Sequence, residues 1–100
     1  MDKKQKLAQE YGVPYTFNIL TRRGIGETTL TLEEVNKDLD GELEFVYRFS
    51  NPYFYQPHME DNRCVAIDFS ETDMIYLGDI MQKDLIVTEI IAPYIIFKKK

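Results

Sequence analysis

The stretch from Glu42 to Tyr55, ELEFVYRFSNPYFY, constrains the fold of this chain more than any other part of the sequence. Large apolar side chains alternate there with mostly polar ones, which is the two-residue period of a β-strand with one buried and one wetted face. Burying a large apolar side chain stabilises a fold by about 1.5 to 3 kcal/mol, so a full face of them sets the position of the core. The buried face is predicted to carry Leu43, Phe45, Tyr47 and Phe49, and the wetted face Glu42, Glu44, Val46 and Arg48.

The length and composition of the chain predict a single small globular domain over residues 1–100, with residues 1–12 as a weak helix or a frayed N-terminal segment. A chain of 100 residues is long enough for one hydrophobic core, and its 44% hydrophobic content is that of an ordinary globular protein. The single cysteine, Cys64, excludes an internal disulfide framework and favours a reducing compartment. We therefore expect a cytoplasmic protein, with neither a secretion signal nor a membrane-spanning segment.

The net charge of −5 conceals a strong segregation along the chain. Residues 33–89 carry fourteen Asp and Glu against four Lys and Arg, a balance of −10, whereas residues 1–32 and 90–100 carry +2 and +3. This acidic middle segment is typical of a solvated surface, and it repels a nucleic-acid backbone. Single-stranded nucleic-acid binding through Arg22, Arg23 and the terminal lysines is therefore the least favoured function.

Several further segments have strand-like patterns. Alternating residues from Tyr15 to Leu20, and a returning run from Ile25 to Leu30, predict a hairpin with Arg22 and Arg23 at its tip. The pattern from Cys64 to Phe69 predicts a strand paired antiparallel with residues 43–49, with Ile67 in the core.

The last part of the chain is rich in β-branched residues. The runs from Leu85 to Ile91 and from Tyr94 to Phe97 predict two strands, or one kinked strand, around Pro93. A strand-forming run of this kind requires a pairing partner for its edge, so a homodimer formed through the region from Leu85 to Phe97 is also expected.

Two segments carry helix signals. Thr31-Leu32-Glu33-Glu34 matches a capping box, and Val35 and Leu39 follow at helical spacing, which predicts a short helix from Leu32 to Leu39. Residues 70–83 fit either a capped helix or a short strand from Met74 to Leu77 ended by Gly78, and the strand is preferred. The chain is thus predicted to be an α+β protein with one short helix and a mainly antiparallel, twisted sheet of about five to six strands, open or curled into a partly open barrel.

The residue types that usually carry catalysis are scarce. His58 is the only histidine, which excludes multi-histidine metal sites. Gly24 and Gly26 lack the spacing of a phosphate-binding loop, and nothing around Cys64 resembles a nucleophile motif. We therefore expect a non-enzymatic protein with no cofactor and no bound metal.

The aromatic loop after the central strand is the best candidate for a binding site. Its rings lie between Pro52 and Pro57, and they either fold back as a lid on the core or form an exposed patch of the composition found at interaction hot spots. Carboxylates beside exposed aromatic rings suit a basic protein surface, which predicts a domain that regulates or inhibits a protein partner. The predicted binding residues are Tyr53, Phe54, Tyr55, His58, Asp61 and Arg63.

A small-molecule-binding domain is the alternative function. In this alternative an aromatic-lined pocket opens at the mouth of the sheet, and His58 or Arg63 fixes the polar end of the ligand. The pocket would be lined by Tyr47, Tyr53, Tyr55 and Tyr76.

Overall fold

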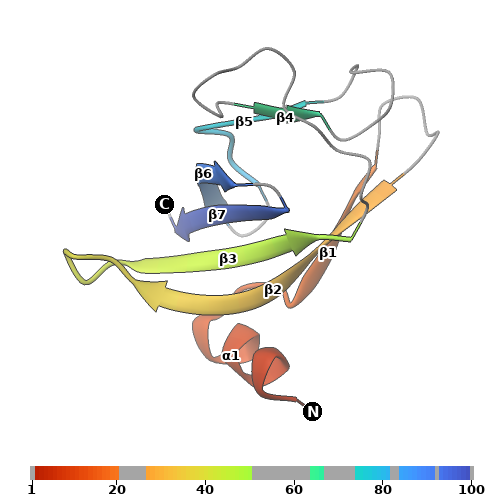
Figure 1. Cartoon of the computed structure of the whole chain (residues 1–100). Helices are drawn as coiled ribbons and strands as arrows, with labels where there is room; N and C mark the ends of the chain where they lie inside the picture. The colour runs from red at the N-terminus through yellow and green to blue at the C-terminus, as the bar shows by residue number, and fades with distance from the viewer. Residues whose placement is uncertain are drawn as a thin grey trace.

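The structure is a computed structural model that describes residues 2–20, 27–50, 64–66, 74–81, 84–91 and 93–99. Within these residues the chain forms one helix and seven strands, which confirms the α+β class (Figure 1). In chain order the elements are α1 (Lys3–Tyr11), β1 (Thr16–Leu20), β2 (Glu27–Lys37), β3 (Leu43–Phe49), β4 (Cys64–Ala66), β5 (Met74–Tyr76), β6 (Leu85–Ile91) and β7 (Tyr94–Lys99).

Five of the strands form one antiparallel sheet in the order β1-β2-β3-β7-β6, and β4 pairs antiparallel with β5 in a separate two-stranded sheet. Figure 1 shows α1 below β2, and the β4–β5 pair on the opposite side of the molecule, above β6 and β7. Among the described strands no pair joins β1 to β6, so closure into a partly open barrel stays a prediction.

The central strand β3 supplies the middle of the core, as its alternating pattern predicts. Phe45, Tyr47 and Phe49 are all buried. Across the pairing with β7, the rings of Tyr47 and Phe97 meet edge to face with their centroids 5.3 Å apart. The core is completed by residues of the neighbouring strands: Leu30, Leu32, Leu85, Val87, Ile90 and Ile95.

The mostly wetted face of β3 contains one buried residue. Val46 is buried on the face opposite the core. It pairs with Glu34 of β2 and with Ile96 of β7, and these neighbours flank it on both sides. A short side chain in the centre of a sheet is covered by its cross-strand neighbours even on the outer face.

The prediction of a helix over residues 32–39 is wrong, because β2 continues through Lys37. The register between β2 and β3 shifts from Leu32 to Glu34, so Glu33 is the extra residue of a β-bulge. The bulge brings Leu32 and Val35 to the core side of the same strand, although they are three residues apart. This spacing imitates a helical stripe, and Leu39, the next residue of that stripe, is fully exposed.

The predicted pairing of residues 64–69 with β3 is also wrong. Both edges of β3 are already occupied, by β2 on one side and β7 on the other. β4 pairs with β5 instead, with Cys64 opposite Tyr76. Cys64 is buried, as expected for a small apolar side chain, whereas Ile67 lies outside the described residues.

The other strand predictions are confirmed. β1 and β2 form the expected antiparallel pair, although Arg22 and Arg23 lie outside the described residues. Residues 74–76 are a strand, and Gly78 follows it with a left-handed φ of 90°. β6 and β7 are separate antiparallel strands on either side of Pro93.

The helix α1 is short but well defined at both ends. Asp2 and Gln5 form a reciprocal capping box at its start, and Gly12 ends it with a left-handed φ of 68°. Its buried residue Ala8, together with Leu7 and Tyr11, packs against the core. The helix thus covers the part of the sheet where β3 begins.

Candidate functional site

All six residues of the predicted binding site lie in the segment 51–63, outside the described residues. They are Tyr53, Phe54, Tyr55, His58, Asp61 and Arg63. The role of the aromatic loop, and whether its rings are exposed, therefore stays a prediction.

The structure describes two of the four tyrosines of the small-molecule alternative, Tyr47 and Tyr76. The Tyr47 side chain is fully buried, and its hydroxyl donates a 2.6 Å hydrogen bond to the carbonyl oxygen of Pro14. This burial raises the pKa of the phenol, since the charged phenolate would be poorly solvated. Tyr76, by contrast, is 45% exposed.

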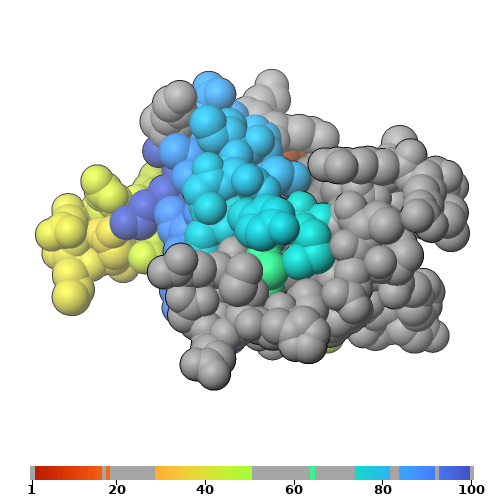
Figure 2. Space-filling model, turned by 90° about the horizontal axis from the view of Figure 1, so that it is seen from above, coloured from red at the N-terminus to blue at the C-terminus, as the bar shows by residue number. Residues whose placement is uncertain are grey.

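A second surface stands out at the turn that follows β5. Tyr76, Leu77 and Ile80 are 45%, 39% and 53% exposed, and they lie within five consecutive residues. We call these three side chains the apolar turn. In Figure 2 the cyan atoms of this part of the chain occupy the middle of the face seen from above.

Hydrogen bonds hold the apolar turn in one conformation. The Asp79 carboxylate accepts a 2.9 Å bond from the backbone N–H of Tyr76, and the Asp79 N–H donates to the Tyr76 carbonyl at 3.1 Å. The turn is also attached to β6, because Gly78 donates to the Val87 carbonyl and Val87 donates to the Asp79 carbonyl. An isolated antiparallel bridge between Ile80 and Ile86 continues this attachment. The exposed side chains thus project from a fixed backbone.

Carboxylates surround the apolar turn in the sequence. Residues 71–89 contain five Asp and Glu against a single Lys, a balance of −4. Within the described part, Asp84 is exposed and Asp79 is half-buried. The surface therefore combines apolar side chains with negative charge, which suits a positively charged partner.

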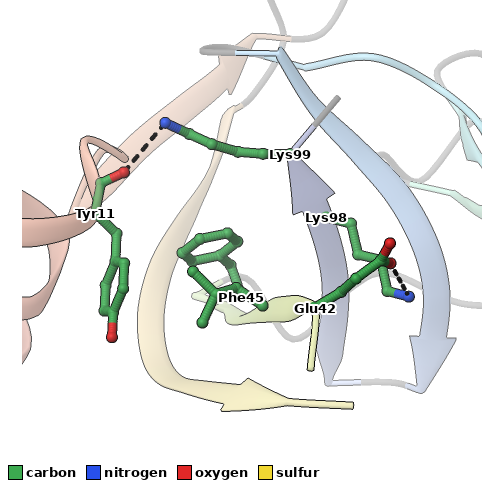
Figure 3. Close-up of a pocket in the computed structure, with 6 residues that line it drawn as sticks. Tyr11, Glu42, Phe45, Lys98 and Lys99 are labelled. Carbon is green, nitrogen blue, oxygen red and sulfur yellow. Dashed lines mark hydrogen bonds and ion pairs between the residues drawn. The ribbon is translucent and has the colours of Figure 1, made fainter. Parts of the chain in front are cut away.

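A pocket of about 280 Å³ lies where α1 ends, and none of its lining residues belongs to the apolar turn (Figure 3). We call it the helix-end pocket. It lies between the last residue of α1, the beginning of β3 and the end of β7. Its lining consists of Tyr11, Glu42, Leu43, Phe45, Lys98 and Lys99.

The two lysines of the helix-end pocket differ in their partners. The Lys98 ammonium lies 2.6 Å from a carboxylate oxygen of Asp38 and 3.1 Å from one of Glu42. The bonds that Lys98 donates, first to Asp38 and then to Glu42, raise the pKa of Lys98, and the bond that Asp38 accepts from Lys98 lowers the pKa of Asp38. Lys99 instead donates a 3.1 Å hydrogen bond to the carbonyl oxygen of Tyr11, as the dashed line in Figure 3 shows.

The sequence analysis missed both surfaces. The turn signal Gly78-Asp79, between the apolar residues Leu77 and Ile80, could have indicated the apolar turn. No local signal predicts the helix-end pocket, because Lys99 meets Tyr11 of α1 across most of the length of the chain.

The described residues contain no group of three or more His, Cys, Asp or Glu side chains that could hold a metal ion. Their one helix, of nine residues, is too short to cross a membrane. A scan against protein-family models, a search of curated proteins and a search of solved structures each find no match to this chain.

Proposed function

We propose that this protein is a non-enzymatic domain that binds, and thereby regulates or inhibits, a protein partner with a basic surface. The observation that carries the proposal is the apolar turn, in which Tyr76, Leu77 and Ile80 are exposed on a hydrogen-bonded backbone. Large exposed apolar side chains that lie next to each other mark interaction surfaces.

The fixed backbone favours binding. A flexible loop loses conformational entropy when it is ordered in a complex, and this loss weakens the affinity. The bonds from Asp79 to Tyr76 and between Gly78 and Val87 impose most of this order before the partner arrives. Preorganisation therefore leaves more of the contact energy for affinity.

The charge of the region favours a basic partner. Negative charge beside exposed apolar side chains accelerates the encounter with a positively charged surface and disfavours acidic ones. In the proposal, Tyr53, Phe54 and Tyr55 of the aromatic loop extend the same contact, with His58, Asp61 and Arg63 beside them.

The first experiment identifies the partner and then measures its affinity. The full chain is used as bait in an extract of the native host, and the captured protein is identified by mass spectrometry and purified. Calorimetry with the purified partner should show a dissociation constant at least tenfold weaker for Leu77→Ser than for the wild type. The affinity should also fall as the salt concentration rises, because salt screens exposed charges.

Leu39 provides the matched control. It is also an exposed leucine in a turn, but it lies in the β2–β3 turn, whose yellow atoms protrude at the left of Figure 2, away from the cyan region. Leu39→Ser should leave the affinity unchanged. Equal affinities for the two variants would exclude the apolar turn as the binding surface. A purified domain that retained a small molecule and captured no protein would favour the ligand-binding alternative.

Two further proposals concern the setting in which the domain works. We place it in the cytoplasm, since its single cysteine suits a reducing compartment.

We also propose a homodimer through residues 85–97, since β6 is an outer strand of the sheet and Ile91 and Tyr94 are exposed at its end.

A further inference from the structure

The helix-end pocket combines an aromatic wall with an ammonium group. Tyr11 and Phe45 meet nearly edge to face, with ring centroids 6.0 Å apart and an interplanar angle of 70°. The half-buried side chain of Leu43 lines the pocket beside them. An apolar group that enters the pocket therefore meets two rings and an aliphatic chain, which is the lining that favours flat hydrophobic ligands.

The size of the pocket limits the ligand to a small one. Its volume of about 280 Å³ is just below the range of roughly 300 to 1,000 Å³ that is typical of ligand sites for drug-sized molecules. A single aromatic ring with a short polar group fits this space, whereas a nucleotide does not.

Lys99 gives the pocket a preference for negatively charged ligands. The Lys98 ammonium is bonded to the carboxylates of Asp38 and Glu42, one positive charge against two negative ones, so Lys98 has no unbalanced positive charge for a ligand. Among the described residues, Lys99 pairs with no carboxylate, and its one hydrogen bond goes to the carbonyl of Tyr11. An ammonium has three donors, so Lys99 retains two for a ligand.

From these contacts we propose that the helix-end pocket binds a small aromatic carboxylate, with its ring between Tyr11 and Leu43 and its carboxylate on Lys99. One ammonium balances one carboxylate, while a dianionic phosphate would leave a negative charge beside the negative end of α1. A cationic ligand would face both lysines and would compete with Lys98 for Glu42, the one carboxylate among the lining residues. This site is separate from the apolar turn, so either proposal can fail without the other.

The competing interpretation is that Lys99 only caps α1. An ammonium beside the last carbonyls of a helix stabilises the helix, and the last turn of α1 has no basic residue of its own. A purely capping role predicts no discrimination between charged and neutral aromatic compounds. The experiment therefore compares ligands that differ only in charge.

The test is an NMR titration of the full chain with phenylacetate, 2-phenylethanol, 2-phenylethylamine and acetate. Phenylacetate should shift the amide signals of Tyr11, Leu43, Phe45 and Lys99, with a dissociation constant of about 1 to 10 mM, as expected for so small a ligand. The neutral alcohol, the amine and acetate should each bind at least about fivefold more weakly. The alcohol and the amine lack the negative charge, and acetate lacks the ring.

Variants separate binding from helix capping. Lys99→Gln should abolish the preference for phenylacetate over 2-phenylethanol, and Lys99→Arg should restore it. Lys6→Gln, which removes an exposed lysine of α1, is the matched control and should bind as the wild type does. If Lys99→Gln fails to fold, Leu43→Ala replaces it. This variant should weaken the binding of phenylacetate and of 2-phenylethanol by the same factor. Equal binding of acid and alcohol by the wild type, or shifts outside the pocket, would overturn the proposal.

Discussion

At the scale of single residues, Phe45 is predicted to contribute strongly to stability. Its ring is fully buried between β2 and β7 and contacts Tyr11. Phe45→Ala should lower the free energy of unfolding by about 3 to 5 kcal/mol, because it leaves a large cavity in a packed core. Urea denaturation monitored by circular dichroism measures this change.

Arg48 on the same strand is the control for Phe45. It is exposed, so Arg48→Ala should change the unfolding free energy by no more than about 0.5 kcal/mol. A melting temperature for Phe45→Ala close to that of the wild type would mean that the register of β3 is shifted by one residue.

Asp38 is predicted to make stability depend on pH. Its carboxylate accepts bonds from Lys98 and from the backbone N–H groups of Glu42 and Asp40, and these bonds hold its pKa below the usual value. An unfolded aspartate titrates near about 3.9, so the stabilisation is present above this pH and is lost as the pH falls through the lower folded pKa. For Lys98, whose pKa is raised, the stabilisation is present below about 10.4 and is lost only at higher pH.

The test for Asp38 compares urea unfolding at pH 7 and at pH 2. Asp38→Asn should be less stable than the wild type at pH 7, and the difference should shrink at pH 2, because the wild-type carboxylate takes up a proton as the pH falls. Asp40→Asn, in the same turn, should unfold like the wild type at pH 7. A difference that stayed constant with pH would contradict a role for the charge of Asp38.

At the scale of elements, the end of α1 depends on Gly12. Its φ of 68° lies in the left-handed region, which a residue with a Cβ adopts at a cost of about 1 to 2 kcal/mol. A Cβ there would lie 3.5 Å from the Lys99 ammonium, an ordinary contact, so the cost is conformational rather than steric. Gly12→Ala should therefore lower the unfolding free energy by about 1 to 2 kcal/mol in urea denaturation.

The opposite result for Gly12→Ala has a clear meaning. Replacing glycine by alanine stabilises a protein when the native backbone accepts alanine, because the unfolded chain loses freedom. A more stable variant would show that α1 does not end in a left-handed residue.

Elements with local patterns could be predicted from the sequence, and elements that depend on distant partners could not. The β1–β2 hairpin and the alternation in β3 follow from neighbouring residues, and the structure confirms them. The bulge at Glu33 places the core-facing residues Leu32 and Val35 three positions apart, because the extra residue lengthens the spacing from two to three at that point. This spacing is the one expected of a helix. The position of β7 beside β3 is set by a ladder between segments about fifty residues apart, which no short window reveals.

The candidate sites also differ in how far the sequence predicts them. The acidic character of the middle segment is visible in the sequence. The helix-end pocket is not, since Tyr11 and Lys99 come together only when the whole sheet has formed.

At the scale of the whole molecule, self-association is the property to measure first. The outer edge of β6 is bonded to the chain around Gly78, Asp79 and Met81 along its first half, which leaves the half from Thr88 to Ile91 as the expected contact. Light scattering at micromolar concentrations should give the mass of a dimer. Ile91→Lys should give the mass of a monomer, because a charge on an edge strand opposes pairing.

The control for the dimer is Lys37→Ala, an exposed change at the far end of β2, which should leave the dimer intact. A wild-type protein that stayed monomeric throughout this concentration range would rule out the homodimer.

The position of β7 in the sheet has a consequence for the synthesis of the chain. β7 follows all other strands in the sequence, yet it lies inside the sheet, between β3 and β6. Until residues 94–99 have left the ribosome, β3 lacks one neighbour, β6 lacks its ladder partner, and their unpaired backbone groups can bind other chains. Nascent chains interrupted before Tyr94 should therefore be recognised by chaperones or aggregate, while chains that extend past Lys99 complete the sheet in one late, cooperative step.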